Sequence, residues 1–458
     1  MVDVTPEKVS GAAPAAVDRT GWPSRTVAWW GLGIITLATL YNFFDAAVFR
    51  MLVQRIKVDL ALSDEELGWL MGPANILFYV LVGIPMARLA DLYPRKLVLS
   101  ASMFLTSTVT SMGGLAQGFA QLFATRTLAG AGGSAHAPAS YSLIADYFPP
   151  GMLPRAIAFL QLGFIGGNVI GSFVGGQMVA YVHDWSPSTV AGLTIFNWQW
   201  VLLALWPPGL LIGFLLLTIK EPPRRGKARE GKAMPLVQVL AEIGKRRAVY
   251  LPLFIGLAFS ALESFGLQEW RVPLLVRKYG WNEAQIGNWL APMLLAGSIA
   301  GLFVGATVTE WLTKRYKDGL VRATVIMFSC AAPCAVIAPL MPTGELCLVF
   351  YSLTGMFGIA SAISQNAAIQ RITPNEMRGQ VTACYLFFFI FFGAIGSVVI
   401  GTVNQRIMGS EADLWKTMSL TAAVLMPLAG ISIAFAIKPF RKEIERLESL
   451  EGQPAPAS

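Results

Sequence analysis

The chain has 458 residues, of which 55% are hydrophobic and only 14% charged, and its formal net charge is +8. Soluble domains carry about 25% charged residues, so this composition excludes an ordinary water-soluble protein and indicates an integral membrane protein. The positive charge does not indicate binding to nucleic acid, because the basic residues flank long apolar segments and act there as a topology signal.

Twelve apolar segments of roughly 20 residues or more are each long enough to cross a hydrocarbon layer of ~30 Å. They lie at 27–49, 68–90, 97–118, 121–147, 156–181, 198–219, 249–276, 284–312, 320–341, 345–370, 378–405 and 414–437. The sequence therefore predicts an all-α polytopic membrane protein. We expect an N-terminal tail (1–26), a six-helix bundle (27–219), a linker (220–247), a second six-helix bundle (248–438) and a solvated C-terminal tail (439–458).

The distribution of Lys and Arg predicts the orientation of these segments. With both termini in the cytoplasm, most of the 35 basic residues fall on cytoplasmic segments, as the positive-inside rule requires. The first apolar segment is long enough to span a membrane, which is typical of a retained signal anchor rather than a cleaved peptide. We therefore expect a multi-pass protein of the cell membrane with cytoplasmic termini.

The fourth segment carries charge within an apolar stretch that is rich in small residues. Arg126 lies near one end of it, and Asp45 of the first segment is expected at a similar depth. A charge within a membrane helix costs roughly 2.5–3.5 kcal/mol unless it faces protein or water, and pairing offsets part of that cost. We expect Arg126 to face an interior cavity and to pair with Asp45. The pair could be a proton-responsive gate or a static bridge that locks helix packing.

His136 and Glu263 are two further ionisable residues within apolar segments. His136 could relay protons or bind substrate, because imidazole titrates near neutral pH, or it could be a neutral side chain bonded to a backbone carbonyl. Glu263 is a candidate for proton coupling, as intramembrane carboxylates usually are, or it makes a structural hydrogen bond. The candidates for proton coupling are thus Asp45, Glu263 and His136. By contrast, Glu269 and Arg271 are expected near the outer membrane interface.

Uncharged polar residues complete the candidate lining of the cavity. Gln365 and Asn366 in the tenth segment could face the cavity, although interhelical hydrogen bonds explain them equally well. Tyr41 and the adjacent Asn42 in the first segment could contact the substrate, and ordinary packing is the alternative for the aromatic ring.

Charged residues at the cytoplasmic ends of the segments are candidates for a gate. Asp91 can accept hydrogen bonds from amides at the N-terminus of a neighbouring helix, and Arg95 and Lys96 can then pair across the two bundles. A similar pattern in the second half is what a duplicated six-helix unit would leave. The predicted gate comprises Asp91, Arg95, Lys96, Arg155, Glu310 and Arg378. Ser63-x-x-Glu66 predicts a capping box with a purely structural role.

The sequence has no motif of a common catalytic or nucleotide-driven site. It contains no P-loop, GxSxG or HExxH, so neither an enzyme nor direct use of ATP is indicated, and no cofactor is expected. The four cysteines lack a CxxC spacing, and neither a disulfide framework nor a metal site is predicted; they are Cys330, Cys334, Cys347 and Cys384.

Three stretches resemble signature regions of the major facilitator superfamily. They are the turn Asp91-Leu-Tyr-Pro-Arg95-Lys96, the fourth-helix motif Arg126-x-x-x-Gly130-x-Gly132 and the Gly-rich run from Gly163 to Gly176. Within the superfamily the chain is most similar to the Spinster-like group, through Asn42-Phe-Phe-Asp45, Leu143-Ile-Ala-Asp146-Tyr-Phe, Lys220-Glu-Pro-Pro and Thr373-Pro-Asn-Glu-Met-Arg378-Gly-Gln. The resemblance covers nearly the whole chain.

Two departures from the Spinster-like pattern concern charge. That group usually has Arg directly after the first-helix Asp, where this chain has Ala46, and Glu after the Gly-x-Gly of the fourth helix, where this chain has Gly133. The usual coupling carboxylate is therefore missing. Either Asp45 with Glu263 replaces it, or transport is not driven by protons.

The resemblance implies a secondary transporter in which two six-helix bundles rock about a central site. It implies a small organic substrate, amphipathic or anionic, carried by a functional monomer, by symport or antiport with protons or without coupling. The cation Arg126 is compatible with an anion in the cavity. The alternative is a membrane sensor or scaffold that has the transporter fold but does not transport, and a long signalling domain would favour that alternative.

Overall fold

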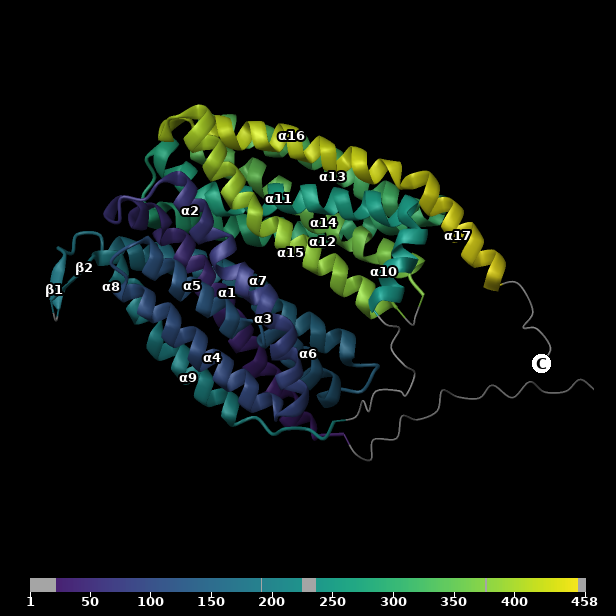
Figure 1. The fold of residues 1–458 in the computed structure, drawn as a ribbon, viewed down its shortest axis with the longest axis horizontal. Coiled ribbons are helices and arrows are strands. Elements are labelled where there is room, and N and C mark those ends of the chain that lie inside the picture. The colour runs from purple at the N-terminus through teal and green to yellow at the C-terminus, as the bar shows by residue number, and fades with distance from the viewer. Residues whose placement is uncertain (1–21, 191, 225–235, 375–376, 452–458) are drawn as a thin grey trace, which may run out of the picture.

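The computed structural model describes residues 22–190, 192–224, 236–374 and 377–451, and almost all of its elements are helices (Figure 1). The α-helices are α1 (Arg25–Asp59), α2 (Asp64–Met71), α3 (Pro73–Leu92), α4 (Arg95–Met112), α5 (Phe119–Gly133), α6 (His136–Tyr147), α7 (Leu153–Tyr181), α8 (Asn197–Ala204), α9 (Trp206–Leu217), α10 (Leu236–Lys245), α11 (Arg247–Tyr279), α12 (Glu283–Arg315), α13 (Gly319–Ile337), α14 (Gly344–Ile372), α15 (Arg378–Val403), α16 (Leu414–Phe435) and α17 (Ile437–Glu451). The expected all-α class is confirmed.

Short elements join some of these helices. Single turns of other helix types are η1 (Gly113–Leu115), η2 (Ala338–Leu340), η3 (Asn404–Met408) and η4 (Glu411–Asp413). One small antiparallel hairpin pairs β1 (Ser188–Val190) with β2 (Leu193–Ile195), between α7 and α8.

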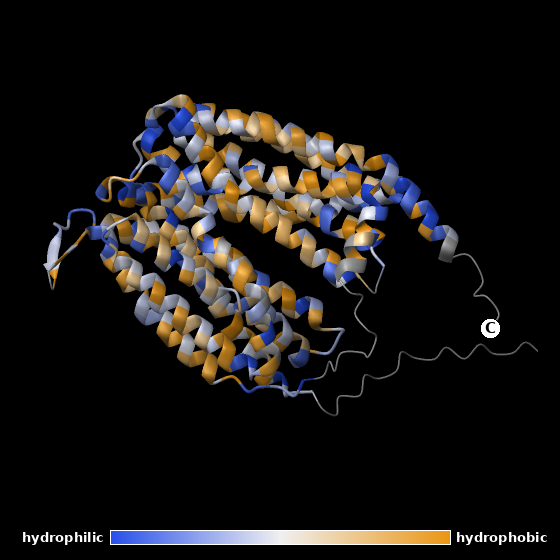
Figure 2. Ribbon diagram, viewed as in Figure 1, coloured by the Kyte–Doolittle hydropathy of each residue, from blue (hydrophilic) through white to orange (hydrophobic). Residues whose placement is uncertain are grey.

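The long helices form two groups that lie side by side (Figure 1). In the first group α1 packs along α7, and α4 packs against α5 and α9. In the second group α11 packs against α15 and α16, and α13 packs against α14 and α16. We call α1–α9 the N half and α11–α17 the C half. Apolar residues run along both halves and hydrophilic residues gather at their ends, as expected for membrane-spanning bundles (Figure 2).

Eleven helical segments of the described chain are long and apolar enough to cross a membrane. They correspond to eleven of the predicted segments, and the remaining one, 121–147, consists of α5 followed by α6 with a break at Ser134 and Ala135. Two other segments are interrupted, between α2 and α3 and between α8 and α9. These breaks lie just before Pro73 and Pro207, and proline lacks the N–H that an unbroken helix requires.

Several helices are longer than the apolar segments that predicted them, among them α1 and α11. α1 continues to Asp59, and α11 runs from Arg247 to Tyr279. The added turns carry charged residues and are therefore not part of an apolar segment. As a result, Asp45 and Glu263 each lie near the middle of a long helix.

Two hydrophilic regions that were expected to be solvated connections contain helices. α10 lies within the predicted linker, and α17 continues from α16 into the predicted C-terminal tail (Figure 1). Many side chains of this helix are exposed, but Phe440 and Ile444 are buried in the core of the C half. These two residues are one helical turn apart, so a mostly charged helix still presents an apolar face.

A row of glycines on α7 allows it to approach α1 closely. Gly163, Gly167, Gly171 and Gly175 are spaced by four residues and therefore lie on one face of the helix. A methyl group added to Gly163 would lie 2.6 Å from a backbone oxygen of α1, and one added to Gly171 would lie 2.7 Å from another. Such contact is typical of helix pairs in membranes. It fixes α1, and with it Asp45, against α7.

We predict that Gly167→Ala destabilises the protein, because the added methyl group would collide with the backbone oxygen of Leu40. Overpacking of this kind costs about 1–3 kcal/mol. Gly166→Ala is the matched control, since its methyl group would meet only Cδ1 of Leu40, at 3.5 Å. Thermal unfolding in detergent is expected to show a lower melting temperature for Gly167→Ala alone. Equal melting temperatures for the two variants would contradict the packing described.

Candidate functional site

Asp45 and Arg126 form the predicted ion pair. Nη1 of Arg126, on α5, lies 3.8 Å from Oδ2 of Asp45, on α1, and the two residues are only 5% and 8% exposed. The hydroxyl of Thr110, on α4, donates a hydrogen bond to Asp45 Oδ2 at 3.5 Å. The guanidinium of Arg126 also lies over the ring of Phe49, 3.9 Å from the ring centre, where cation–π attraction offsets part of the cost of burial.

This pair leaves polar atoms unsatisfied. Asp45 Oδ1 and Arg126 Nε are buried and have no hydrogen-bond partner within the described chain. The 3.8 Å separation of the charged atoms is too long for a hydrogen bond. An unpaired buried polar group costs about 1–3 kcal/mol, so a proton or a ligand that bonded to these atoms would offset that cost.

A second buried ion pair lies near the first and links the two halves. Nη1 of Arg50, on α1, lies 3.5 Å from Oε1 of Glu269, on α11, and Arg50 also donates a hydrogen bond to Asn168 Oδ1 at 2.7 Å. Glu269 is within electrostatic range of Arg126 and Arg271 as well. Glu269, which the sequence predicts near the outer membrane interface, is buried against the N half, and α11 continues beyond it to Tyr279.

Glu263, one of the predicted candidates for proton coupling, is completely buried on α11, with 0% of the residue exposed. The hydroxyl of Ser264 donates to Glu263 Oε2 at 3.2 Å, whereas Oε1 has no partner among the described residues. Arg271 is within electrostatic range of Glu263, and its guanidinium lies 5.1 Å from the centre of the Tyr351 ring, on α14. Nε of Arg271 is also buried without a partner in the described chain.

These residues make up what we call the central charge cluster, which comprises Asp45, Arg50, Arg126, Glu263, Glu269 and Arg271. When all six are ionised, the N half contributes two arginines and one acid, and the C half one arginine and two acids. The halves therefore carry opposite net charges of +1 and −1 here, and the cluster as a whole is neutral. Neutrality matters because uncompensated buried charge costs several kcal/mol.

Arg50 was missed by sequence reasoning because it lies beyond the apolar segment at 27–49. It follows Ala46 by four residues, so the two lie on one face of α1, a single turn apart. Arg50 thus supplies a first-helix cation close to the position where the Spinster-like pattern has Arg and this chain has Ala46.

The other predicted lining residues of the N half make hydrogen bonds outside the central charge cluster. His136 Nε2, at the start of α6, lies 2.9 Å from the hydroxyl oxygen of Thr39, while its Nδ1 is buried without a partner among the described residues. The hydroxyl of Tyr41 donates to the backbone oxygen of Leu205. Asn42 is half-buried on α1.

The predicted lining residues of the C half also make local contacts. Gln365 is buried on α14, and its Oε1 accepts a hydrogen bond from the hydroxyl of Tyr385, on α15, at 3.0 Å. Asn366 donates to the backbone oxygen of Ala362, on its own helix, at 2.8 Å. Gln365 therefore makes the interhelical hydrogen bond that was the alternative to a cavity role.

The predicted gate residues Arg95 and Lys96 do not pair across the halves in this structure. Arg95 is buried and binds Asp146, its Nε lies 2.9 Å from Glu221 Oε1, and the backbone N–H of Lys96 donates to Glu221 Oε2 at 3.0 Å. Glu221 follows shortly after α9, the last helix of the N half. Its carboxylate therefore lies at the start of α4 and binds Arg95 and Lys96 there. The expected cross-half pairing is thus replaced by pairing within the N half.

The remaining predicted gate residues make local contacts or none across the halves within the described chain. Glu310 pairs with Lys314 on the same helix at 2.6 Å, and Arg378 donates to the backbone oxygen of Thr373 at 3.5 Å. Arg155 is exposed at the start of α7. The side chain of Asp91 lies outside the described residues.

The two halves are joined instead at the opposite end, through Asp64 at the start of α2. Asp64 is 1% exposed and accepts hydrogen bonds from Arg277 at 2.8 and 2.9 Å and from Asn404 at 2.7 Å. Nζ of Lys57 lies 3.1 Å from its Oδ1. We call this group, together with the flanking pairs Arg55–Glu283 and Glu65–Arg406, the closed-end cluster.

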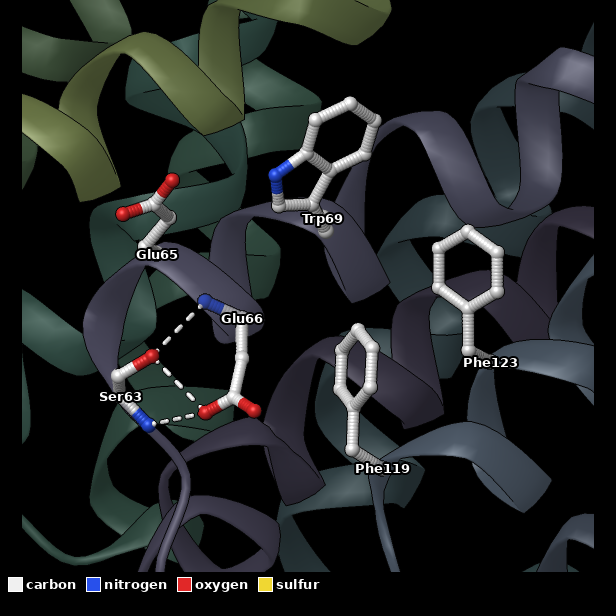
Figure 3. A pocket seen from close by; sticks show the side chains of 6 residues that line it. All are labelled: Ser63, Glu65, Glu66, Trp69, Phe119 and Phe123. Carbon is white, nitrogen blue, oxygen red and sulfur yellow. Dashed lines mark hydrogen bonds between the residues drawn. The ribbon is translucent and has the colours of Figure 1, made fainter.

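The predicted capping box at Ser63 and Glu66 is present and positions Asp64. The backbone N–H of Glu66 donates to the Ser63 hydroxyl at 3.2 Å, and Glu66 Oε2 accepts from the backbone N–H of Ser63 at 2.8 Å (Figure 3). This cap fixes the first turn of α2, so that Asp64 is buried against the C half while Glu65 stands beside a shallow pocket of about 420 Å³. Sequence reasoning found the cap but missed the buried acid inside it.

Many hydrogen bonds and ion pairs that link the two halves lie between the central charge cluster and this closed end. They include Ser397 Oγ to the backbone oxygen of Gly68 at 2.8 Å and Gln177 to Asn288 at 2.9 Å. Toward the other end, where α10 and α17 lie, the two halves diverge (Figure 1). We call that end the tail end. The contacts thus describe two bundles held together at one end.

We predict that Asp64→Asn loosens the closed end, because it leaves Lys57 and Arg277 without a buried counter-charge. Removing one partner of a buried ion pair typically costs about 3–5 kcal/mol. Glu65→Gln is the matched control, because the Glu65–Arg406 pair is exposed and exposed pairs contribute about 0–1 kcal/mol. A cysteine introduced at the buried Ser397 reports the result through its rate of labelling by a soluble maleimide.

Faster labelling of the introduced cysteine is expected in Asp64→Asn and not in Glu65→Gln. If both variants label at the wild-type rate, Asp64 does not hold the closed end together.

Comparison with known proteins agrees with this architecture. The family model described as Major Facilitator Superfamily matches residues 35–397. An MFS-type efflux pump from Mycolicibacterium smegmatis is 26% identical over 430 residues, which covers 93% of this chain and 96% of that protein. The sphingosine-1-phosphate transporter SPNS2 of Xenopus tropicalis is 23% identical, with 94% of this chain and 85% of that protein covered.

A solved structure has the same fold. It is a bacterial homologue of the human lysosomal transporter Spinster, in an inward-facing and unoccupied conformation, and it matches with a TM-score of 0.79 at 23% identity, covering 95% of this chain and 100% of that one. The resemblance to the Spinster-like group is thereby confirmed, and a membrane transporter of small-molecule substrates is supported by the relatives as a group. Because the family model matches most of the chain, this protein belongs to the Major Facilitator Superfamily.

Proposed function

We propose that this transporter is a secondary carrier of amphipathic organic anions that works by alternating access and couples transport to protons. The observation that carries the proposal is the central charge cluster, in which buried arginines and acids from both halves meet and several of their polar atoms lack partners. Intramembrane charge is costly and is retained where a protein uses it for substrate or ion movement. On this proposal the chain carries out no catalysis.

The free donors of the cluster favour an anion. Arg126 and Arg271 each keep a buried Nε–H without a partner in the described chain, and a guanidinium binds carboxylate or phosphate through two parallel hydrogen bonds. The rings of Phe49 and Tyr351 lie against these two guanidiniums and offer apolar surface next to the charge. An anion with an apolar body fits this combination. Two relatives whose names give anionic substrates are consistent with it, the gallate transporter of Pseudomonas putida and SPNS2.

The distribution of contacts supports alternating access. Passage through the closed end requires the Asp64 interactions and the Arg50–Glu269 pair to separate, since both bridge the halves. When they separate, Glu269 loses its link to Arg50, and the N half retains the excess positive charge. An anion bound by Arg126 would replace the lost negative charge, so substrate binding lowers the cost of the transition.

The buried acids supply candidates for proton coupling. Glu263 Oε1 and Asp45 Oδ1 are both buried and unpartnered among the described residues, so each can take up a proton without breaking a hydrogen bond. The Spinster-like pattern would place a carboxylate at Gly133, and a Cβ added there meets nothing within 4 Å. We propose that Asp45 and Glu263 carry the protons in place of that missing group.

The distribution of charge supports an orientation in the membrane, and the composition of the site supports a functional monomer. The tail end carries clusters of Lys and Arg such as Arg95–Lys96 and Lys314–Arg315, which the positive-inside rule assigns to the cytoplasm. Both termini would then be cytoplasmic in the cell membrane, and the structure would be open inward. Every member of the central charge cluster comes from one chain, so a monomer is sufficient for transport.

We predict that proteoliposomes containing the protein take up organic anions. Radiolabelled gallate and sphingosine 1-phosphate are the anionic probes, and puromycin, named in the description of a Streptomyces alboniger relative, is the cationic probe. Arg126→Gln is expected to reduce uptake of the anion at least tenfold, the equivalent of about 1.4 kcal/mol. Lys416→Gln, at an exposed pair far from the cluster, is the control and should leave uptake unchanged. Uptake of puromycin but of neither anion would contradict the proposed substrate class.

We predict that an imposed pH gradient drives this uptake in the wild type. Asp45→Asn and Glu263→Gln should each abolish the dependence on the gradient while leaving exchange of substrate across the membrane intact, because they remove a proton site and keep the side-chain shape. Gly133→Glu combined with Glu263→Gln should restore part of the dependence. If wild-type flux does not depend on the gradient, and flux persists in both single variants, proton coupling is refuted. That result would leave the proposed substrate class unaffected.

A further inference from the structure

A second group of charged and aromatic side chains lies at the tail end of the C half, apart from the transport site. Here α12 ends, α13 begins, and the start of α17 passes beside the loop between them. A surface groove of about 330 Å³ opens at this point. Its lining includes the aromatic residues Trp311 and Tyr316, the apolar residues Val325, Ile326 and Ile437, and the cation Arg322.

One buried acid holds this site together. Asp318, in the loop between α12 and α13, is completely buried and accepts hydrogen bonds from Nε of Arg322 at 2.7 Å and from Nη2 of Arg441, on α17, at 2.7 Å. Burial alone would raise the pKa of Asp318, but the hydrogen bonds and charges of the two arginines outweigh burial and hold the pKa below its ordinary value. Asp318 is therefore ionised and balances only one of its two cations.

Several further cations at the site have no acidic partner within the described chain. Arg315, the last residue of α12, forms no ion pair, and its guanidinium lies over the ring of Trp311, 4.5 Å from the ring centre. Arg322 lies in the same way over Tyr316, at 4.4 Å. Lys438 and Lys442 at the start of α17 are exposed and likewise unpaired. Two arginines thus lie at the groove, Arg322 in its lining and Arg315 against the lining residue Trp311.

The rest of the groove is apolar and faces outward. Ile326 is 42% exposed and Trp311 is 49% exposed, although both belong to helices that cross the membrane. Exposed apolar side chains on such helices contact lipid chains, and Trp and Tyr prefer the boundary between the chains and the head groups. The cations therefore lie at the level of the head groups, directly beyond the apolar part of the groove.

We propose that this groove is a binding site for an anionic phospholipid, with the phosphate held by Arg315 and Arg322 and one acyl chain lying along Val325, Ile326 and Ile437. Nη1 of Arg322 makes no hydrogen bond within the described chain, so its guanidinium keeps a donor for the phosphate while Nε remains on Asp318. Basic pockets between membrane helices recognise anionic head groups in this way. A free phosphate would satisfy the cations but leave the apolar channel unfilled.

The test is native mass spectrometry of the detergent-purified, full-length protein, titrated separately with dioleoyl-phosphatidylglycerol, dioleoyl-phosphatidylcholine and inorganic phosphate. The two lipids share their acyl chains, so their difference reports the head-group charge. The variants are Arg315→Gln and Arg322→Gln for the cations and Ile326→Trp for the channel. Lys416→Gln, which removes a cation at the closed end, is the matched control.

We expect one phosphatidylglycerol molecule to be retained in preference to phosphatidylcholine, with the apparent dissociation constant raised about fivefold or more by each arginine variant. Ile326→Trp should weaken retention by filling the channel, and Lys416→Gln should not. Arg315→Gln and Ile326→Trp decide the matter if Arg322→Gln fails to fold, because neither removes a partner of Asp318. Equal retention of the two lipids, equal retention in all variants, or displacement of phosphatidylglycerol by millimolar inorganic phosphate would overturn the proposal.

Discussion

Charge that is buried between apolar helices must be balanced, and this requirement shapes the arrangement of the two halves. The N half brings one excess positive charge to the centre of the protein and the C half one excess negative charge, so the halves attract each other there. The balance exists only while Arg50 and Glu269 remain close. A conformation in which the halves separate at this level leaves each with unbalanced charge, which is costly in an apolar surrounding.

The closed-end cluster and the central charge cluster both lie at the interface between the halves, but they differ in how fully their polar atoms are hydrogen-bonded. Asp64 is saturated, because two cations and an amide share its two carboxylate oxygens. The central charge cluster is not saturated, since four of its polar atoms are buried without a partner in the described chain. A saturated contact stabilises one state, whereas an unsaturated one responds to protons and ligands. Together, the closed-end cluster stabilises a state that is closed at one end, and the central charge cluster responds to protons and ligands.

Much of the fold was predictable, because apolar length alone marks membrane helices. The pair of Asp45 and Arg126 was predictable as well, since two opposite charges at equal depth in membrane helices have few other ways to offset their burial.

The missed features depend on tertiary contacts. Asp64 and Arg277 lie 213 residues apart in the sequence, and nothing near either residue indicates the other. Glu221 captures Arg95 and Lys96 only because α9 ends beside the start of α4. The sequence of α17 suggested a solvated end because its buried apolar residues, Phe440 and Ile444, lie among many charged ones.

The most direct test of the account is a distance measurement across the tail end. Spin labels at Gly151→Cys and Gly379→Cys, two positions where an added side chain meets nothing within 4 Å, report the separation of the halves there by double electron–electron resonance. In the otherwise wild-type protein we expect a predominantly long distance. With Arg50→Gln and Glu269→Gln introduced together, we expect a growing population at shorter distance, because the innermost link between the halves is gone. An unchanged distance distribution in that double variant would contradict the claim that buried charge holds the halves in this arrangement.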